Sequence, residues 1–111
     1  MRRGWIASAT FVAAVAVAGC GGGDADPGER DRAIAGAEDA YAQAVEDGTD
    51  LSSGPCIAEE LPGVQGWAAD IAHNPREPVD DEPANQCASF RSGEATHFVE
   101  LTPDGDVIRA E

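Results

Sequence analysis

The N-terminal segment limits what this chain can fold into, because its first nineteen residues are not expected to belong to the mature fold. Arg2 and Arg3 give the N-terminus a positive charge, and the stretch from Ile6 to Gly19 then has no charged residue. An apolar run of about fourteen residues fits a signal peptide and is shorter than the roughly twenty residues of a membrane-spanning helix. The fold must therefore come from the residues that follow, in a chain of 111.

The end of this apolar run is more specific than a general export signal. Val17, Ala18 and Gly19 precede Cys20, and this tetrapeptide resembles the bacterial lipobox, in which small residues precede a cysteine that accepts a diacyl lipid. The resemblance implies a lipoprotein that begins at Cys20 and is anchored on the extracytoplasmic face of the cell membrane. An ordinary secretory signal with a chance cysteine is the alternative. The Arg2-Arg3 pair leaves twin-arginine export open beside the general secretory route.

We expect three parts: a signal peptide over 1–19, a flexible tether over 20–26 and one small domain over 27–111. The tether contains three consecutive glycines and has no apolar periodicity. Asp26, Pro27 and Glu29 then form a helix start signal, and Gly48 forms a stop signal. The sequence predicts a helix over 28–47 whose apolar stripe comprises Ile34, Ala37, Tyr41, Ala44 and Val45.

The rest of the domain is predicted to be mainly strands and turns. The stretch 67–73 matches both strand and helix spacing, and we interpret it as a strand. Three prolines over 74–83 predict an extended loop. The C-terminal third predicts a three-stranded meander over 87–91, 95–101 and 106–110. The expected fold class is therefore α+β, with one N-terminal helix packed on a small antiparallel sheet of these three strands and a possible fourth, and the loop partly over the other face.

Acidic residues dominate the charge of the chain. The sequence has 21 Asp and Glu against 7 arginines and no lysine, a formal net charge of −14. This balance argues against nucleic-acid binding, and the missing lysine excludes Schiff-base chemistry and a P-loop. Acidity would also hold a tethered domain away from anionic headgroups, so that the acyl chains alone anchor it. A compositional bias of the coding sequence explains the acidity equally well.

Two cysteines remain once Cys20 is assigned to the lipid. Export makes a disulfide between Cys56 and Cys87 the expected state, and only one pairing is available. A redox-active dithiol is the alternative, but these residues do not form a Cys-x-x-Cys motif. A domain with so few large apolar side chains needs such a covalent link.

The mature region resembles small uncharacterised lipoproteins of high-GC Gram-positive bacteria over about half of the chain. The matching segments are 54–56, 72–76, 78–81, 85–87 and 97–101. This resemblance implies a location and a fold class, and it assigns no catalytic residue. A fainter similarity, to PepSY-type exported modules with a helix and a sheet ending in an Asp-Gly hairpin, would imply an inhibitory or interaction role.

The predicted contact surface is the proline-rich loop from Asn74 to Gln86 together with Trp67. A stiff loop has little conformational freedom left to lose on binding, and an exposed tryptophan would be an anchor. The residues singled out there are Trp67, Pro78, Asp80 and Asp81. The other interpretation of Trp67 is that it belongs to the core.

We therefore expect a non-enzymatic binding or interaction module without a cofactor, whose partner is an envelope protein or a small ligand. The alternative is a small surface hydrolase or a divalent-metal-binding protein that uses Asp70, His73 and His97. No ligand spacing in the sequence matches an EF-hand or a zinc helix. Convergence of these three side chains in a pocket would favour the alternative.

Overall fold

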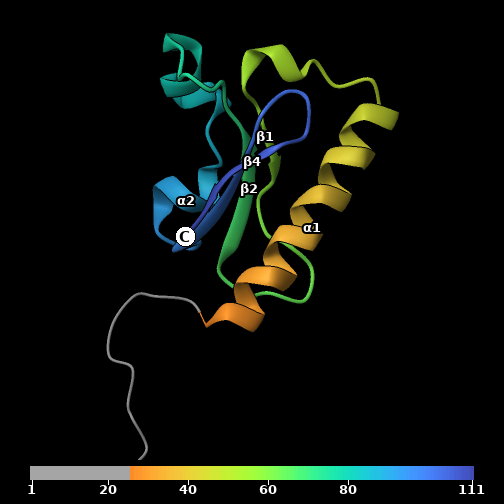
Figure 1. Cartoon of the computed structure of the whole chain (residues 1–111). Coiled ribbons are helices and arrows are strands. Elements are labelled where there is room, and N and C mark those ends of the chain that lie inside the picture. Colours follow the sequence, from red (N-terminus) through yellow and green to blue (C-terminus); the bar gives the residue numbers. More distant parts are fainter. Residues whose placement is uncertain (1–25) are drawn as a thin grey trace, which may run out of the picture.

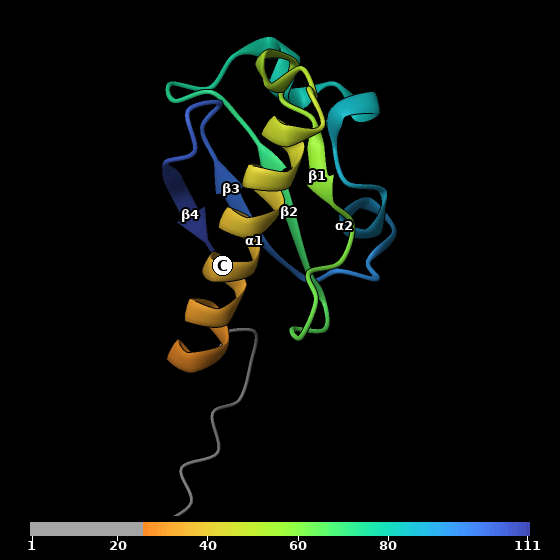
Figure 2. The same ribbon diagram turned by 90° about the vertical axis from the view of Figure 1, so that its right-hand side faces the viewer.

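The computed structural model describes residues 26–111; the predicted signal peptide, Cys20 and all of the tether except Asp26 lie outside the described residues. Among these residues, two α-helices lie on opposite sides of a four-stranded sheet, and the second of them is short (Figures 1 and 2). In chain order they are α1 (Pro27–Glu46), β1 (Cys56–Ala58), β2 (Trp67–Ile71), α2 (Ala88–Ser92), β3 (His97–Leu101) and β4 (Val107–Ala110).

Helix α1 begins and ends where the cap residues predict. The Asp26 carboxylate accepts a hydrogen bond from the backbone N–H of Glu29 at 2.8 Å, and Gly48 follows the helix with φ 74°. Ala33, Ala37 and Ala44 are buried, so the helix packs closely through small side chains. The prediction for Val45 was wrong: this side chain is 52% exposed, because it lies about 100° around the helix from Ala44.

The sheet is mixed, with strand order β1-β2-β3-β4. β1 and β4 run antiparallel to their neighbours, whereas β2 and β3 pair in parallel. The predicted α+β class, with an N-terminal helix packed on a small sheet, is confirmed, whereas the prediction that the sheet is antiparallel was wrong for the β2–β3 pair. The chain leaves the end of β2, crosses over, and returns to the start of β3, as a parallel pair requires.

The segment 87–91 was predicted as the first strand of a meander, and this prediction was wrong. Cys87 is instead the N-cap of helix α2, and residues 88–91 form most of that helix. The carboxylate of Glu59 accepts hydrogen bonds from the backbone N–H groups of Ala88 and Ser89, at 3.2 and 2.8 Å. These are N–H groups that a helix start leaves without a partner. Gly93, with φ 87°, ends the helix.

The main core lies between α1 and one face of the sheet. Trp67, Ala69 and Ile71 of β2 point to this face and pack with apolar residues of β3 and α1. Trp67 has no exposed surface; its ring stacks on His97 with centroids 4.7 Å apart, and its Nε1 donates to Glu29. Of the two interpretations of Trp67, the core residue is therefore confirmed and the exposed contact anchor is wrong.

The opposite face of the sheet is partly covered by α2 and by the chain that leads into it (Figure 1). The predicted disulfide is present: Cys56 at the start of β1 is bonded to Cys87, just before α2. Cys87 packs with Ala68 and Ala95 in a second, smaller core. The predicted strand over 67–73 is confirmed over Trp67–Ile71. Within residues 26–111, no helix has the length and apolar character needed to cross a membrane.

Candidate functional site

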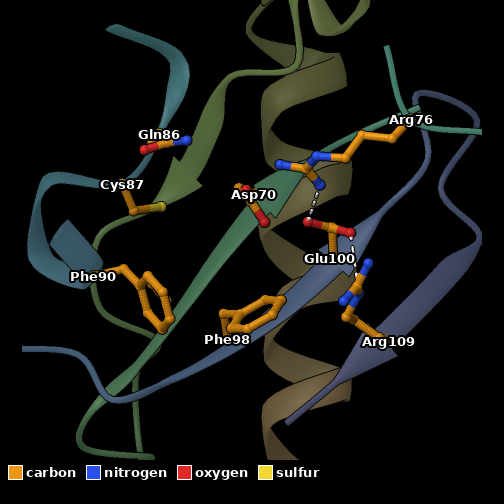
Figure 3. A pocket seen from close by; sticks show the side chains of 9 residues that line it. Asp70, Arg76, Gln86, Cys87, Phe90, Phe98, Glu100 and Arg109 are labelled. Atoms are coloured by element: carbon orange, nitrogen blue, oxygen red, sulfur yellow. Dashed lines mark hydrogen bonds and ion pairs between the residues drawn. The ribbon is translucent and has the colours of Figure 1, made fainter. Parts of the chain in front are cut away.

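A cavity of about 350 Å³ lies on the sheet face that α1 does not cover (Figure 3). Strands β2, β3 and β4 form its floor, α2 forms one wall, and Arg76 and Gln86 reach it from the two ends of the long loop. Its volume is in the range of small-ligand sites. The lining residues are Ala68, Asp70, Arg76, Gln86, Cys87, Phe90, Phe98, Glu100 and Arg109.

The register of the sheet places three charged residues side by side in this floor. Asp70 of β2 is opposite Glu100 of β3, and Glu100 is opposite Arg109 of β4. Side chains at such paired positions point to the same face of a sheet. Two carboxyl groups and one guanidinium therefore meet in one row across three strands.

Glu100 forms the centre of the polar end of the cavity. Its side chain is only 6% exposed, and its two oxygens pair with Arg76 Nη1 at 3.1 Å and Arg109 Nε at 3.3 Å. Each arginine has a second acidic partner: Arg76 Nε binds Asp81 at 2.8 Å, and Arg109 Nη1 lies 3.8 Å from Glu111. Both guanidinium charges in the cavity are thus already matched by carboxylates.

Asp70 has no such partner. Its Oδ1 is buried and makes no hydrogen bond to any described residue. The pKa of Asp70 is raised from 3.8 to about 7, mainly by burial and next by the charge of Glu100, and the charge of Arg76 only partly opposes these effects. Figure 3 shows this carboxyl between the Glu100 ion pairs and two phenyl rings. A buried acceptor without a donor is rare enough in folded proteins to need an explanation.

The apolar end of the cavity consists of those two rings. Phe90 from α2 and Phe98 from β3 meet edge to face, with centroids 5.1 Å apart. Phe90 is 43% exposed although it is one of the few large apolar residues of the chain. An apolar wall therefore faces the unpaired Asp70 across a space open to solvent.

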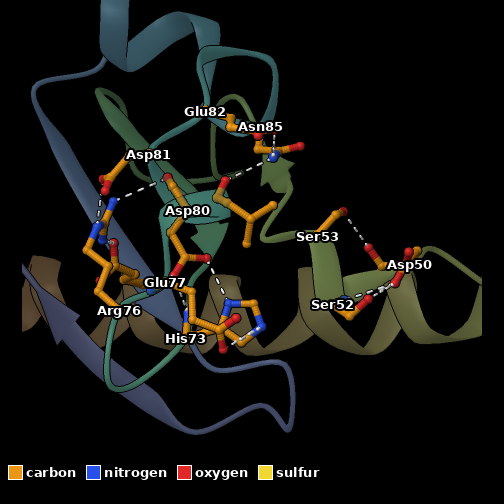
Figure 4. A network of polar contacts seen from close by, with 12 residues as sticks. Asp50, Ser52, Ser53, His73, Arg76, Glu77, Asp80, Asp81, Glu82 and Asn85 are labelled. Atoms are coloured by element: carbon orange, nitrogen blue, oxygen red, sulfur yellow. Dashed lines mark hydrogen bonds and ion pairs between the residues drawn. The ribbon is translucent and has the colours of Figure 1, made fainter.

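The proline-rich loop is held by buried Asp80 (Figure 4). Its Oδ2 accepts the backbone N–H groups of His73 and Glu77, at 2.9 and 2.8 Å, and its Oδ1 lies 3.0 Å from His73 Nδ1. Burial alone would raise the pKa of Asp80, but these hydrogen bonds outweigh it and leave the pKa lowered. Asp80 is thus an internal support of the loop, and its prediction as a contact residue was wrong.

Other loop residues differ from Asp80. Pro78 and Asp81 are exposed, so their role in a contact surface stays a prediction. The loop is also less extended than predicted, because Pro78 and Pro83 each begin a one-turn 3-10 helix, Pro78–Asp81 and Pro83–Asn85. Proline is well suited to a first helical position, where its missing N–H costs no hydrogen bond.

The three candidate metal or catalytic residues do not form one site. His97 lies against Trp67 on the α1 face, Asp70 lies in the cavity on the opposite face, and His73 is bonded to Asp80 in the loop. The convergence that would favour a hydrolase or metal site is therefore missing among the described residues. A different set of potential metal ligands does lie close together among the described residues: Cys56, Glu59 and Cys87. This set is unsuited to a metal because both sulfurs are in the disulfide.

No protein-family model, curated protein or solved structure matches the chain. The similarity to small lipoproteins stays an expectation from the sequence, and what the site does must be argued from its own residues.

Sequence reasoning missed most of the cavity. It selected Asp70 for a different role, and it did not select Arg76, Phe90, Glu100 or Arg109. Alternation along a strand is enough to put Phe98 and Glu100 of β3 on the face opposite to Val99 and Leu101. The missing information was the parallel register of β2 and β3, which brings Asp70 beside Glu100.

Proposed function

We propose that this protein is a lipid-anchored extracytoplasmic binding module, non-enzymatic, whose small ligand occupies the cavity between α2 and the sheet. The observation that supports it is the combination of a partly buried carboxyl without a partner among the described residues, Asp70, with a half-exposed phenyl ring, Phe90, around one space. Both features are unfavourable in a free domain. A ligand that covers the ring and hydrogen-bonds the carboxyl would remove both penalties.

The rigid surroundings of the cavity also favour binding. Its floor is three paired strands, and α2 is fixed to β1 by the disulfide and to Glu59 by backbone hydrogen bonds. A site built on such elements has little freedom to lose when a ligand binds. Arg76 and Gln86, from the loop predicted as a contact surface, complete the rim.

The anchoring part of the proposal rests on the sequence around Cys20 and is consistent with the disulfide. Disulfides persist mainly in compartments outside the reducing cytosol. The short distance in sequence from Cys20 to α1 would keep the cavity close to the membrane surface.

The anchor is tested by expressing the full chain in a bacterium and measuring its mature N-terminus by mass spectrometry. We expect a chain that begins at a diacylated Cys20 and incorporates a labelled palmitate analogue. Cys20→Ser should lose the label. A double variant with Cys56→Ser and Cys87→Ser should keep it, as the matched control. An unmodified chain that begins elsewhere would overturn the anchor.

The cavity is tested by an NMR screen of small charged and uncharged fragments against the isotope-labelled protein. Binders should shift the amide signals of Ala68, Asp70 and Phe98 and leave the outer face of α1, for example Glu38, unaffected. Phe90→Ala should weaken these binders at least severalfold, whereas Val107→Ala, also at an exposed apolar residue, should not. A screen in which every binder maps away from the cavity would overturn the proposal.

A further inference from the structure

We propose that the ligand is a small organic cation, an ammonium group attached to an apolar substituent, held between Asp70 and the phenyl rings of Phe90 and Phe98. This inference rests on the proposed function and adds the ligand class. The ammonium group would pair with the carboxyl of Asp70, which lines the cavity and has no ion pair or hydrogen bond to a described residue, and the substituent would cover the exposed ring.

The charges around the cavity favour a cation over an anion. Two guanidinium groups line it, but Arg76 and Arg109 are both bound to Glu100 and each has a further acidic neighbour. An anion would compete with these carboxylates for the guanidinium groups and would have to approach the carboxyl of Asp70 as well. A cation meets neither obstacle, because Asp70 is the one carboxyl in the lining without a counter-ion or donor among the described residues.

The aromatic pair adds a second, independent preference for the same charge. The faces of phenyl rings attract cations, and the attraction grows when water is excluded. The edge-to-face arrangement of Phe90 and Phe98 leaves ring surface directed into the cavity (Figure 3). A volume of about 350 Å³ admits an amine with a ring or a short alkyl chain and is small for a peptide segment.

Binding of a cation would also depend on the proton at Asp70. The charged groups that act on this carboxyl are Glu100 on β3, Arg109 on β4, and Arg76 and Asp80 in the segment after β2. With a pKa of about 7, Asp70 is mostly protonated at pH 6 and mostly ionised at pH 8. Affinity for an ammonium ligand should therefore rise about tenfold over this interval, as the binding-competent fraction rises.

The test uses the full-length protein, purified from the cell envelope, and three matched probes in isothermal titration calorimetry. The probes are 2-phenylethylammonium, the neutral 2-phenylethanol and the anionic 3-phenylpropanoate. We expect the ammonium probe to bind at least tenfold more tightly than the other two at pH 8. Its affinity should fall about tenfold at pH 6, with release of a proton from Asp70 detected by the buffer dependence of the heat.

Two variants complete the test. Asp70→Asn has the same shape without the charge and should lose the preference for the ammonium probe and its pH dependence. Asp104→Asn changes an exposed acid in the β3–β4 turn and should behave as the wild type. If the neutral or anionic probe binds in the cavity as tightly as the ammonium probe, the ligand class is wrong and the binding function stands. Failure of all three probes overturns the ligand class, and the fragment screen then decides separately whether the cavity binds anything.

Discussion

At the scale of single residues, Asp70 lowers stability in the pH range where most proteins work. Its pKa in the folded protein is about 7, against an ordinary value of 3.8, because burial disfavours the charged form. The folded state therefore binds this proton more tightly than the unfolded state. The stabilisation that this bound proton gives the folded state is fully present below about pH 4 and is lost as the pH rises through 7. Natural proteins accept such unfavourable groups most often at functional sites.

We predict that Asp70→Asn changes the pH profile of stability. Between pH 5 and pH 8, the free energy of unfolding of the variant should rise relative to that of the wild type by roughly 2 to 3 kcal/mol, because the variant has no charge to bury. Urea unfolding at the two pH values measures this. Asp104→Asn, in an exposed turn, should follow the wild type. Parallel profiles of Asp70→Asn and the wild type would contradict the raised pKa.

At the scale of elements, contacts between segments far apart in the sequence hold the fold together. The β3–β4 turn is one case: the Tyr41 hydroxyl of α1 donates to the Pro103 carbonyl at 2.9 Å. Gly105 has φ 95°, and a Cβ there would lie 2.8 Å from Tyr41 Cε1. Glycine is thus required both by the backbone conformation and by the close approach of the ring.

Gly105→Ala should therefore destabilise the protein more than Gly63→Ala does. Gly63 has a similar φ of 80° but open space around its Cβ position, so it isolates the effect of the Tyr41 ring. We expect Gly105→Ala to cost roughly 1 to 2 kcal/mol beyond the cost of Gly63→Ala, by analogy with overpacking in cores. Equal losses in denaturant unfolding would mean that the ring moves aside freely.

The disulfide is the other long-range link between elements. It joins residues 31 apart in sequence, and closing a loop of that length stabilises a protein by roughly 3 to 4 kcal/mol. The double variant Cys56→Ala and Cys87→Ala should have a lower melting temperature, and reduction of the wild type should reproduce most of the loss. A melting temperature that is indifferent to reductant would contradict this role.

Local signals in the sequence predicted some elements and not others. Helix α1 was predictable because its start and stop signals, Asp26 with Pro27 and Gly48, lie at the ends of the segment itself. Helix α2 was not, because its N-terminal N–H groups are bound by Glu59, 29 residues earlier than Ala88. The two faces of β3 can be assigned from the alternation of its residues, whereas the pairing of Asp70 with Glu100 depends on a crossover that no local pattern specifies.

The candidate site follows the same division. Asp70 was recognised as a chemical group, but its environment could not be read from its neighbours in sequence. Asp70 stays unpaired because the two nearby arginines, Arg76 and Arg109, are bound to Glu100 instead. These three residues come from three separate segments of the chain. For Trp67 the local pattern correctly predicted a strand. Its complete burial depends on where α1 packs, which the local pattern does not specify.

At the scale of the whole molecule, the net charge of −14 opposes compaction. Exposed acids extend along the outer face of α1, including Glu38, Asp39 and Glu46, and the last turn of that helix has no basic residue to offset its dipole. Repulsion between exposed charges is screened over about 10 Å at 0.1 M salt, whereas the partly buried pairs of Glu100 are screened less. Salt should therefore remove more repulsion than attraction.

We predict that raising NaCl from about 10 to 200 mM increases the melting temperature by several degrees, since the Debye length shortens over this range. A variant with Glu38→Gln, Asp39→Asn and Glu46→Gln should be more stable than the wild type at low salt and gain less from added salt, because part of the repulsion is already gone. Sucrose, which stabilises without screening, should raise both melting temperatures equally. A melting temperature that falls with NaCl would mean that the ion pairs around Glu100 outweigh the repulsion of the acidic surface.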